Sequence, residues 1–402
     1  MSQAPIAIVG AGIGGLAAAL FLSRKGFPVT LVEKRLNVEE EGAGLQLSPN
    51  ASRILLDAGL GPALALRAGA PERIRILSAM DAREVAAIPL GHQAKERYGA
   101  PYLVIHRADL AGLLRDAVRG EPRIELLHGR EAVSCVEGAD CVRLALRGEN
   151  GSSLEFEASA VIAADGLWGR LAGAGEPPRF CGFAAWRALT PVAGAPAFAR
   201  ANEVGLWLGR HAHLVHYPVR GGEAVNIVAV IKERHAQEGW SRPGDACLIR
   251  SAFADWSEAA RDLIASAPGW RSWSLFDRKP RRGWGSGLAT LLGDAAHPML
   301  PFLAQGAAMA IEDAAVLALA LAPFAAAGSS RDRATALRIY EQARRARTAR
   351  AQGEARRNLF AYHAPWPFAA ARDLVLSGAS GESLLARYDW LYGWRADAAR
   401  QK

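Results

Sequence analysis

The sequence predicts an α/β protein in which a parallel, Rossmann-like sheet is assembled from two separate segments of the chain. Three observations predict this fold. A glycine-rich strand–helix unit opens the chain, strand-like and helix-like segments alternate up to about residue 176, and a buried strand pattern resumes at residues 288–294. Such alternation is typical of parallel sheets covered by helices. The intervening residues 177–276 contain short strand-like runs, which predict a mixed α+β domain.

The N-terminal unit has the pattern of a dinucleotide-binding loop. An apolar strand leads into Gly10, Gly12, Gly14 and Gly15, an alanine-rich helix follows, and the next strand ends at Glu33. The first glycine permits a tight turn, the second lets the backbone approach a pyrophosphate, and the last lets helix and strand pack closely. The helix N-terminus favours the anion, and Glu33 stands where a carboxylate accepts ribose hydroxyls. An unrelated glycine-rich turn would leave Glu33 unexplained.

The size and composition of the chain limit the classes of protein to which it can belong. A chain of 402 residues with 50% hydrophobic content is long enough for more than one domain. No secretion signal is visible at the N-terminus, and the longest apolar tract, residues 314–327, is short and contains Pro323. We therefore expect a buried helix there and no integral membrane segment. The four cysteines are far apart, which argues against a metal site or disulfides and indicates the cytoplasm.

The net charge of +8 raises the question of a nucleic-acid partner, but the basic residues are not combined with aromatics in any recognition motif. We therefore expect no nucleic-acid binding. The densest basic run, residues 338–357, lies on a predicted helix. A solvated helix face is the favoured interpretation of this run, ahead of a phosphate-binding surface.

A second glycine–acid junction, Gly293-Asp294, leads into a helix that begins near Gly306. A nicotinamide dehydrogenase needs no such junction near its C-terminus, whereas FAD extends well beyond its adenine half. Asp294 can accept hydroxyls of the ribityl chain, and the helix dipole from Gly306 can stabilise negative charge on a reduced flavin ring. Asp294 as a simple helix cap would leave the rest of this segment unexplained.

Together these segments resemble the single-component flavin aromatic hydroxylases, such as the salicylate, hydroxybenzoate and 6-hydroxynicotinate hydroxylases. The resemblance covers nearly the whole chain but does not specify one substrate. Besides the two glycine–acid segments, it is carried by residues 42–50, 106–110, 165–166, 213–218 and 388–394.

The resemblance implies FAD as the cofactor and NADH or NADPH as the electron donor. The residues implied to bind the cofactor are Gly10, Gly12, Gly14, Gly15, Glu33, Lys34, Gly44, Gln46, Arg107, Asp165, Asp294, Pro301, Gly306 and Ala307. Among these, Arg107 would contact the phosphate region, and Gly306 and Ala307 would offer N–H groups to the flavin ring. The chain departs from the family at Gly169, where a serine usually follows the Asp165-Gly166 pair.

The substrate is expected beside the strand 213–218. Period-two alternation places His213 and Tyr217 on one face of it and His216 on the other. A phenolate is a better nucleophile than a phenol, and an imidazole is a suitable base for that proton. This strand is similar to one in several related hydroxylases, in which a histidine and a tyrosine at this spacing line the pocket. The resemblance thus implies His213 as the catalytic base and Tyr217 as a hydrogen-bond donor, with an ordinary sheet-surface histidine as the alternative.

Two further residues are expected near the substrate. Arg187 could bind a substrate carboxylate, the alternative being a surface ion pair. Phe302 is expected at the ring pocket. The 6-hydroxynicotinate enzymes have a histidine at the matching position, so their substrate is less favoured here.

The predicted enzyme is thus an FAD-dependent monooxygenase that uses NAD(P)H and O2 to hydroxylate a phenolic acid or heteroaromatic ring through a flavin C4a-hydroperoxide. One alternative is a monooxygenase of the same fold acting on a non-aromatic or quinone-precursor substrate. The other is an NAD-binding dehydrogenase or sensor. We expect a monomer or homodimer, with FAD-binding segments at 1–176 and 277–325, a substrate domain at 177–276 and a helical region at 326–402.

Overall fold

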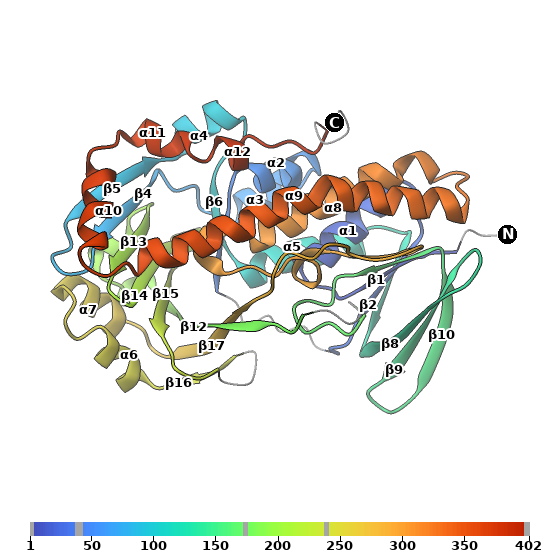
Figure 1. The fold of residues 1–402 in the computed structure, drawn as a ribbon, viewed down its shortest axis with the longest axis horizontal. Helices are drawn as coiled ribbons and strands as arrows, with labels where there is room; N and C mark the ends of the chain where they lie inside the picture. Colours follow the sequence, from blue (N-terminus) through green and yellow to red (C-terminus); the bar gives the residue numbers. More distant parts are fainter. Residues whose placement is uncertain (1–3, 37–42, 172–175, 237–240, 398–402) are drawn as a thin grey trace.

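The computed structural model describes residues 4–36, 43–171, 176–236 and 241–397 (Figure 1). Its first sheet is parallel and has five strands, in the order β18-β11-β1-β2-β7. The strands of this sheet are β1 (Ile6–Val9), β2 (Val29–Glu33), β7 (Ile124–His128), β11 (Ala160–Ala163) and β18 (Ala289–Leu291). The late strand β18 completes the sheet next to β11, so the predicted return of the chain to the first sheet is confirmed.

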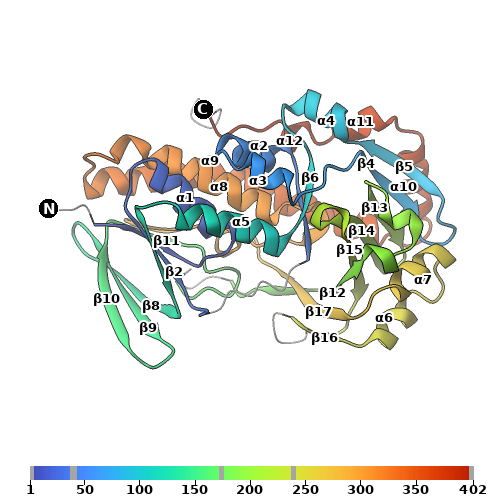
Figure 2. The ribbon, with the colours of Figure 1, turned by 180° about the vertical axis from the view of Figure 1, so that it is seen from behind.

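Helices cover one face of this sheet and a small antiparallel sheet covers the other (Figure 2). Ile6 and Ile8 pack on the helical side, whereas Ala7 and Val9 pack against the antiparallel strands, as period-two alternation requires. The helices on this side are α1 (Ile13–Arg24), α5 (Arg107–Arg119) and α8 (Gly306–Leu321). The antiparallel strands are β8 (Arg130–Glu137), β9 (Val142–Gly148) and β10 (Ser153–Ala158).

The second large sheet has eight strands, in the order β16-β17-β12-β15-β14-β13-β4-β5. Its strands are β4 (Arg73–Ser78), β5 (Glu84–Pro89), β12 (Arg179–Pro191), β13 (Val204–Gly209), β14 (Ala212–Val219), β15 (Ala224–Lys232), β16 (Arg242–Gly244) and β17 (Trp270–Asp277). The expectation that the strands before residue 176 form the parallel sheet is therefore wrong for β4 and β5 and for β8–β10. It is also wrong for β3 (Gly44–Leu47) and β6 (Leu103–His106), which pair with each other. β4 pairs with β13, about 130 residues later, so this partnership leaves no local sequence signal.

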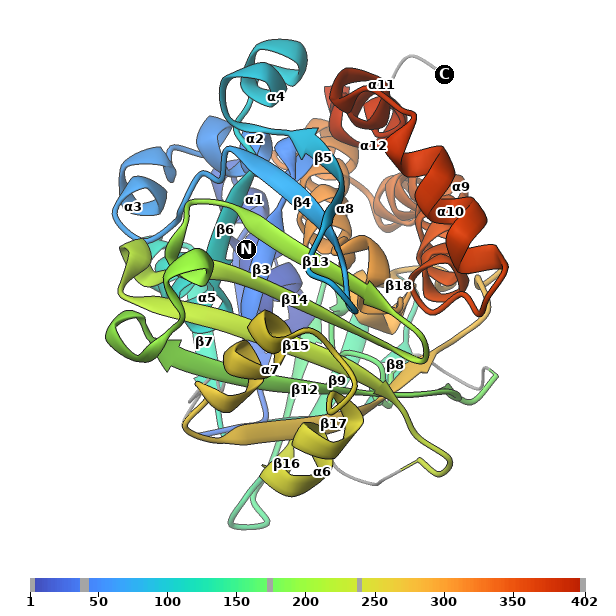
Figure 3. The ribbon, with the colours of Figure 1, turned by 90° about the vertical axis from the view of Figure 1, so that its left-hand side faces the viewer.

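The two faces of the eight-stranded sheet have different neighbours (Figure 3). Its outer face packs on α6 (Ala246–Ala252) and α7 (Glu258–Ala265) through residues such as Trp186 and Trp207. Its inner face packs on Phe302, which lies in a short 3-10 turn, and on Ala355 of helix α9 (Ser330–Tyr362). The inner face is thus turned toward the cofactor side of the molecule.

Helix α9 runs along much of the length of the molecule (Figure 1). It carries the basic run, and the solvated-face interpretation is wrong for two of its arginines. Arg344 is fully buried and Arg347 is nearly so, and both form ion pairs with Glu312 of α8. Arg345, Arg350 and Arg357 remain exposed. The basic pattern therefore combines a buried ionic stripe with a solvated one.

Short elements complete the structure. A two-stranded sheet, β3 (Gly44–Leu47) with β6 (Leu103–His106), lies between the two large sheets. The remaining helices are α2 (Pro49–Asp57), α3 (Gly61–Ala65), α4 (Gly91–Tyr98), α10 (Phe368–Ser377), α11 (Gly381–Ala386) and α12 (Asp389–Tyr392). The segment Gly306–Phe324, made of α8 and the turn after it, is long and apolar enough for a membrane span, but 61% of its most apolar window is buried. Ala314 and Leu317 lie in the protein core, as predicted for the tract 314–327, although α8 ends at Leu321.

Candidate active site

The glycine loop between β1 and α1 has the geometry of an anion cradle. Gly10 has φ +105°, a conformation that favours glycine, and a Cβ on Gly15 would lie 1.9 Å from the Gly10 carbonyl oxygen. A Cβ on Gly12, in contrast, would meet no atom within 4 Å. The loop is therefore tightly packed at Gly10 and Gly15. It is open at Gly12, where a pyrophosphate would approach the helix N-terminus.

Glu33 at the end of β2 is oriented by the backbone. Its Oε2 accepts a hydrogen bond from the Ala11 N–H at 2.9 Å, and its Oε1 accepts one from the Arg35 N–H at 3.0 Å. The carboxylate is thereby fixed beside the glycine loop. Each oxygen keeps a second lone pair that can accept a ribose hydroxyl.

The second junction follows β18. Asp294 lies in the 3-10 turn η4 (Gly293–Ala295) and is exposed, although surrounding protein desolvates its carboxyl and raises the pKa. The carboxyl is therefore accessible to a ligand, although protein atoms crowd around it. The Cβ position of Gly306, at the start of α8, is 4.0 Å from Asp294 Oδ1, so the two predicted flavin-binding features are neighbours.

A buried ionic cluster, which sequence reasoning missed, holds this junction. Asp313 of α8 accepts the Gly293 N–H at 3.0 Å, lies 2.5 Å from His297 Nε2 and pairs with Arg344 Nε at 2.7 Å. Burial would raise the pKa of Asp313, but His297 and Arg344 outweigh it and lower that pKa. The sequence signal was the adjacent pair Glu312-Asp313 in an otherwise apolar helix, because buried acids require partners.

The strand β3 connects the cofactor side to the inner face of the large sheet. The Gly44 N–H donates to Asn226 Oδ1 at 2.6 Å, and a Cβ on Gly44 would overlap Tyr217 and Asn226. Gln46 accepts a hydrogen bond from the Tyr102 hydroxyl through Oε1. Burial raises the pKa of the Tyr217 phenol, whereas a hydrogen bond with Gln46 lowers it in part. An amide N–H donated to the phenol oxygen has this effect and leaves the Tyr217 O–H free to donate.

The strand register places His213, Tyr217 and Arg187 on the same face. His213 lies opposite Val230, and Tyr217 lies opposite Asn226, on β15. Arg187 of β12 lies opposite Val228, in the row between those two. Because cross-strand partners share a face, all three side chains are on the inner face. His216 is on the outer face, where its Nδ1 accepts the Trp207 indole N–H at 3.1 Å.

His213 is 4% exposed, so the sheet-surface alternative is wrong. Its Nδ1 lies 2.9 Å from Nε2 of His363, the residue that follows α9. Phe302 and Tyr362 pack edge-on against its ring, with centroids 5.4 and 5.3 Å away. Burial, and then His363, hold the pKa of His213 well below its usual value. His213 is therefore a neutral imidazole, and the predicted neighbour Phe302 is in contact with it.

Among the described residues, the guanidinium of Arg187 faces an aromatic ring and pairs with no carboxylate. Its guanidinium stacks on Trp273, with 3.4 Å between the guanidinium carbon and the ring centroid. Burial, and then repulsion from Arg107, lower the pKa of Arg187 to about 9, so it is charged at neutral pH. Among the described residues it forms no ion pair, and its Nε has no hydrogen-bond partner there. The alternative of a surface ion pair is thus not supported.

The other predicted residues lie around these features. Arg107 is the first residue of α5 and lowers the pKa of both Asp294 and Arg187, so it is close to both. Pro301 is exposed in the turn η5 (Pro301–Leu303), next to Phe302, and Ala307 is the second residue of α8. Burial raises the pKa of Asp165, which accepts the Leu171 N–H at 3.2 Å.

The departure at Gly169 has a steric reason in this structure. A Cβ there would lie 2.1 Å from the Asp165 carboxyl. A serine at this position would therefore require the Asp165 side chain to move.

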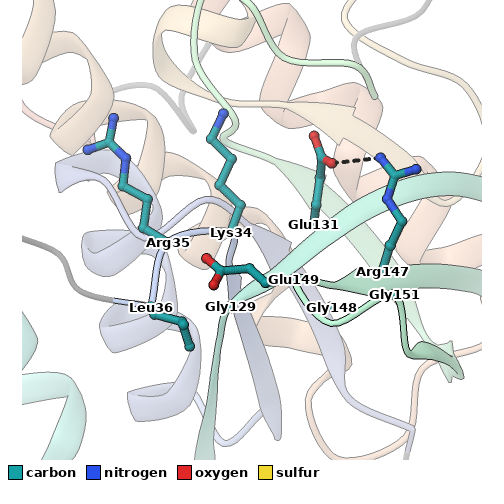
Figure 4. A pocket seen from close by; sticks show the side chains of 9 residues that line it. All are labelled: Lys34, Arg35, Leu36, Gly129, Glu131, Arg147, Gly148, Glu149 and Gly151. Carbon is teal, nitrogen blue, oxygen red and sulfur yellow. Dashed lines mark hydrogen bonds and ion pairs between the residues drawn. The ribbon is translucent and has the colours of Figure 1, made fainter.

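Lys34 is exposed and lines an open hollow of about 750 Å³ beside the end of β2 (Figure 4). Glu131 and Arg147 form an ion pair on its opposite side. Within the described ranges, no group of three or more His, Cys, Asp or Glu side chains could hold a metal ion.

A model of the family described as FAD binding domain matches residues 3–355. The chain belongs to this family. It is 37% identical over 392 residues to a 3-hydroxybenzoate 6-hydroxylase of Klebsiella oxytoca, covering 97% of this chain and 96% of that protein. It is also 37% identical to the 3-amino-4-hydroxybenzoate 2-monooxygenase PtnB3 of Streptomyces platensis, with the same two coverages. A solved salicylate hydroxylase substrate complex has a TM-score of 0.82 and 27% identity, and covers 100% of this chain and 98% of that one.

The protein is therefore an FAD-dependent monooxygenase of the aromatic-hydroxylase type, and the dehydrogenase or sensor alternative is excluded. FAD fits the residues present in this monooxygenase. The open space at Gly12 suits the pyrophosphate, Glu33 the ribose, and the desolvated but exposed Asp294 beside Gly306 suits the flavin half.

Proposed function

We propose that this monooxygenase hydroxylates the ring of a small aromatic acid that carries both a carboxylate and a hydroxyl group, with O2 and NADH or NADPH as co-substrates. The observation that carries the proposal is that one sheet face holds both a neutral imidazole and a half-buried guanidinium that forms no ion pair with any described residue. These two groups match the two polar substituents of a hydroxybenzoate. FAD, when bound, supplies the redox chemistry by accepting hydride and activating oxygen.

Arg187 binds the carboxylate end in this proposal. A guanidinium that is stacked on Trp273 and lacks a protein counter-ion gains most from an anionic ligand, because its desolvation is otherwise uncompensated. The curated relatives support this choice. Their names include 3-hydroxybenzoate, 3-amino-4-hydroxybenzoate and 6-hydroxynicotinate as substrates, and each of these carries a carboxylate.

His213 and Tyr217 serve the hydroxyl end. The neutral imidazole of His213 accepts the phenol proton, which raises the electron density of the ring toward oxygen transfer. Tyr217 donates its O–H to a substrate oxygen, since Gln46 occupies the other side of its phenol oxygen. Phe302 contributes an apolar wall next to His213. This wall favours a benzoate ring over the more polar hydroxynicotinate ring.

Two further properties follow the sequence-based expectations. We propose a cytoplasmic location, supported by four cysteines that are all free thiols. We also propose that the enzyme works as a monomer or homodimer.

A spectral titration tests the proposed substrate class. The flavin absorbance of the holoenzyme is titrated with 3-hydroxybenzoate and with phenol, which lacks the carboxylate. A charged hydrogen bond contributes about 1.5–3 kcal/mol, so we expect phenol to bind roughly 10- to 100-fold more weakly. Arg187→Met should abolish this difference in affinity. With the wild type, 3-hydroxybenzoate should stimulate NAD(P)H oxidation and be converted to a dihydroxybenzoate.

Arg179→Met is the matched control, because Arg179 lies on the same strand but is exposed and pairs with Glu176. It should leave both affinities unchanged. Equal binding of the two ligands by the wild type, or discrimination that survives Arg187→Met, would contradict the carboxylate assignment. Saturable binding of non-aromatic ligands alone would favour the remaining alternative substrate class.

A further inference from the structure

We propose that His363 is a positioning residue that fixes the tautomer of His213, so that Nε2 of His213 is the proton acceptor. This inference rests on the proposed function for its catalytic meaning, but the tautomer itself does not depend on it. The proposal rests on a chain of two hydrogen bonds that runs from the Leu359 carbonyl through the His363 ring to the His213 ring. Each link in this chain is a 2.9 Å contact.

The carbonyl sets the direction of the chain. The Leu359 oxygen can only accept, so the His363 Nδ1 that faces it must carry a proton. A neutral imidazole has one N–H, so Nε2 of His363 is then an acceptor. It faces Nδ1 of His213, which must therefore be the protonated nitrogen of that ring. The lone pair of His213 is left on Nε2.

Both rings are neutral, as this argument requires. Burial lowers the pKa of His213 well below its usual value, and burial also lowers the pKa of His363, to about 4. The charged or titratable groups that act on His363 from neighbouring elements, His211 and Arg372, lower its pKa further. No described residue forms a hydrogen bond with Nε2 of His213, so this nitrogen is available to a substrate hydroxyl.

The fold holds His363 firmly in this orientation. It follows the last residue of α9, and its ring is stacked on Phe183 of β12 with centroids 4.4 Å apart and an interplanar angle of 18°. Phe302 packs against it edge-on. The ring is therefore constrained by the end of α9, by the sheet and by the turn η5.

The proton balance of the step is simple. The substrate O–H bond breaks, its proton bonds to Nε2 of His213, and the electron pair stays on the substrate oxygen as phenolate. His213 becomes an imidazolium whose Nδ1–H is already hydrogen-bonded to Nε2 of His363, an arrangement that stabilises the new charge. The proton returns to the product oxygen when the product leaves. Without His363, Nδ1 and Nε2 of His213 would compete for the single proton.

Nitrogen NMR of the full-length holoenzyme tests the tautomer without any substrate. The enzyme is labelled with ¹⁵N-histidine, and the His213 signals are assigned by their loss in His213→Gln. We expect a protonated Nδ1 and an unprotonated Nε2 in the wild type. His363→Phe, which keeps the stack on Phe183 but has no acceptor, should shift His213 toward the Nε2–H form. An unprotonated Nδ1 in the wild type would overturn the proposal.

Kinetics with 3-hydroxybenzoate test the consequence. We expect His363→Phe to lower kcat at least tenfold with little change in KM, because general-base catalysis contributes about 10²–10⁴-fold. His363→Gln offers an amide oxygen as an acceptor and should recover part of that rate. Thermal melting identifies any variant that fails to fold, and the NMR result then decides.

The two proposals can fail separately. A wild-type enzyme that does not hydroxylate any hydroxybenzoate, but has the expected tautomer, would refute only the proposed function. Equal kcat in wild type and His363→Phe on a turned-over substrate would refute the role of His363.

Discussion

Gly44 is the residue at which the cofactor side of the molecule touches the inner face of the large sheet. Its N–H is bonded to Asn226, and its missing side chain leaves room for the Tyr217 ring. No other residue type allows both contacts without displacing Tyr217. One glycine therefore determines the distance between β3 and the strand that carries the predicted catalytic residues.

We predict that Gly44→Ala destabilises the enzyme by about 1–3 kcal/mol, the usual effect of overpacking. The new Cβ would lie 2.5 Å from a Tyr217 ring carbon. Urea unfolding measures the loss. Gly112→Ala is the control: it lies inside α5 with open space around it, and replacing a helical glycine should stabilise by up to about 1 kcal/mol. Effects of the same sign in both variants would disprove this explanation.

At the residue scale, the sequence predicts best where the pattern is local. Gly10, Gly12 and Glu33 could be identified because a short strand, loop and helix contain all the information about their geometry. His363 could not, because its contact with His213 joins residues 150 positions apart. The aromatic environment of Arg187 could not be predicted either, because Trp273 lies on another strand.

Helices α8 and α9 form the ionic framework of the cofactor side. Glu312 and Asp313 of α8 receive Arg344 and Arg347 from α9, and Glu312 also accepts a hydrogen bond from Asn50 of α2. Buried charges of this kind are costly when one partner is removed, because the other is left uncompensated.

We predict that Arg344→Met destabilises the enzyme by about 3–5 kcal/mol in urea unfolding at neutral pH. Arg345→Met, at the adjacent exposed position, should stay within about 0.5 kcal/mol of the wild type. The expectation fails if the two variants unfold at the same urea concentration.

The same cluster has a pH signature. The pKa of Asp313 is lowered in the folded state, so the stability that it contributes is present above its unfolded pKa of about 3.9. That stability is lost as the pH falls through the lower, folded pKa. The wild type should therefore lose stability below about pH 4, and Arg344→Met should lose less over the same range.

At the scale of elements, the basic helix was predicted but its burial was misread. Residues 338–357 read as a solvated face because arginines occur on several sides of the helix. The missing information was the acidic pair on α8, which is the partner of only two of those arginines. A charge pattern alone does not distinguish a buried ionic stripe from an exposed one.

The whole molecule depends on two chain segments meeting around one cofactor. β1 and the Gly12 turn come from the first segment, whereas β18, Asp294 and the start of α8 come from a segment almost 300 residues later. FAD would contact both segments, so its binding free energy adds to the stability of their association.

We predict that removing FAD lowers the Tm by several degrees. Ligand at a hundredfold excess over Kd stabilises a protein by about 2.7 kcal/mol. Asp294→Ala should bind FAD at least tenfold more weakly and should melt like the apoenzyme at low FAD. The ratio of flavin to protein absorbance and a thermal melt measure both effects, with the exposed Asp81→Ala as control. Full flavin occupancy in Asp294→Ala would contradict its assigned role.

The overall architecture was largely readable from the sequence, but the extent of the second sheet was not. Alternation and the returning strand predicted the parallel sheet and its discontinuous origin. The boundaries at 176, 276 and 325 stay predictions, and β4 and β5 lie in the first segment while pairing in the eight-stranded sheet. Strand partners across such distances are selected by packing rather than by local pattern.

The rows of the inner sheet face have a consequence for how such an enzyme can change its substrate. Arg187 shares its row with Val228 and Val215, while His213 and Tyr217 occupy the rows on either side. Substitutions in the middle row would alter the volume and charge offered to a ring substituent, while the rows that carry the proposed proton-transfer residues stay intact. New specificities can therefore evolve, or be engineered, one side chain at a time on an unchanged catalytic scaffold.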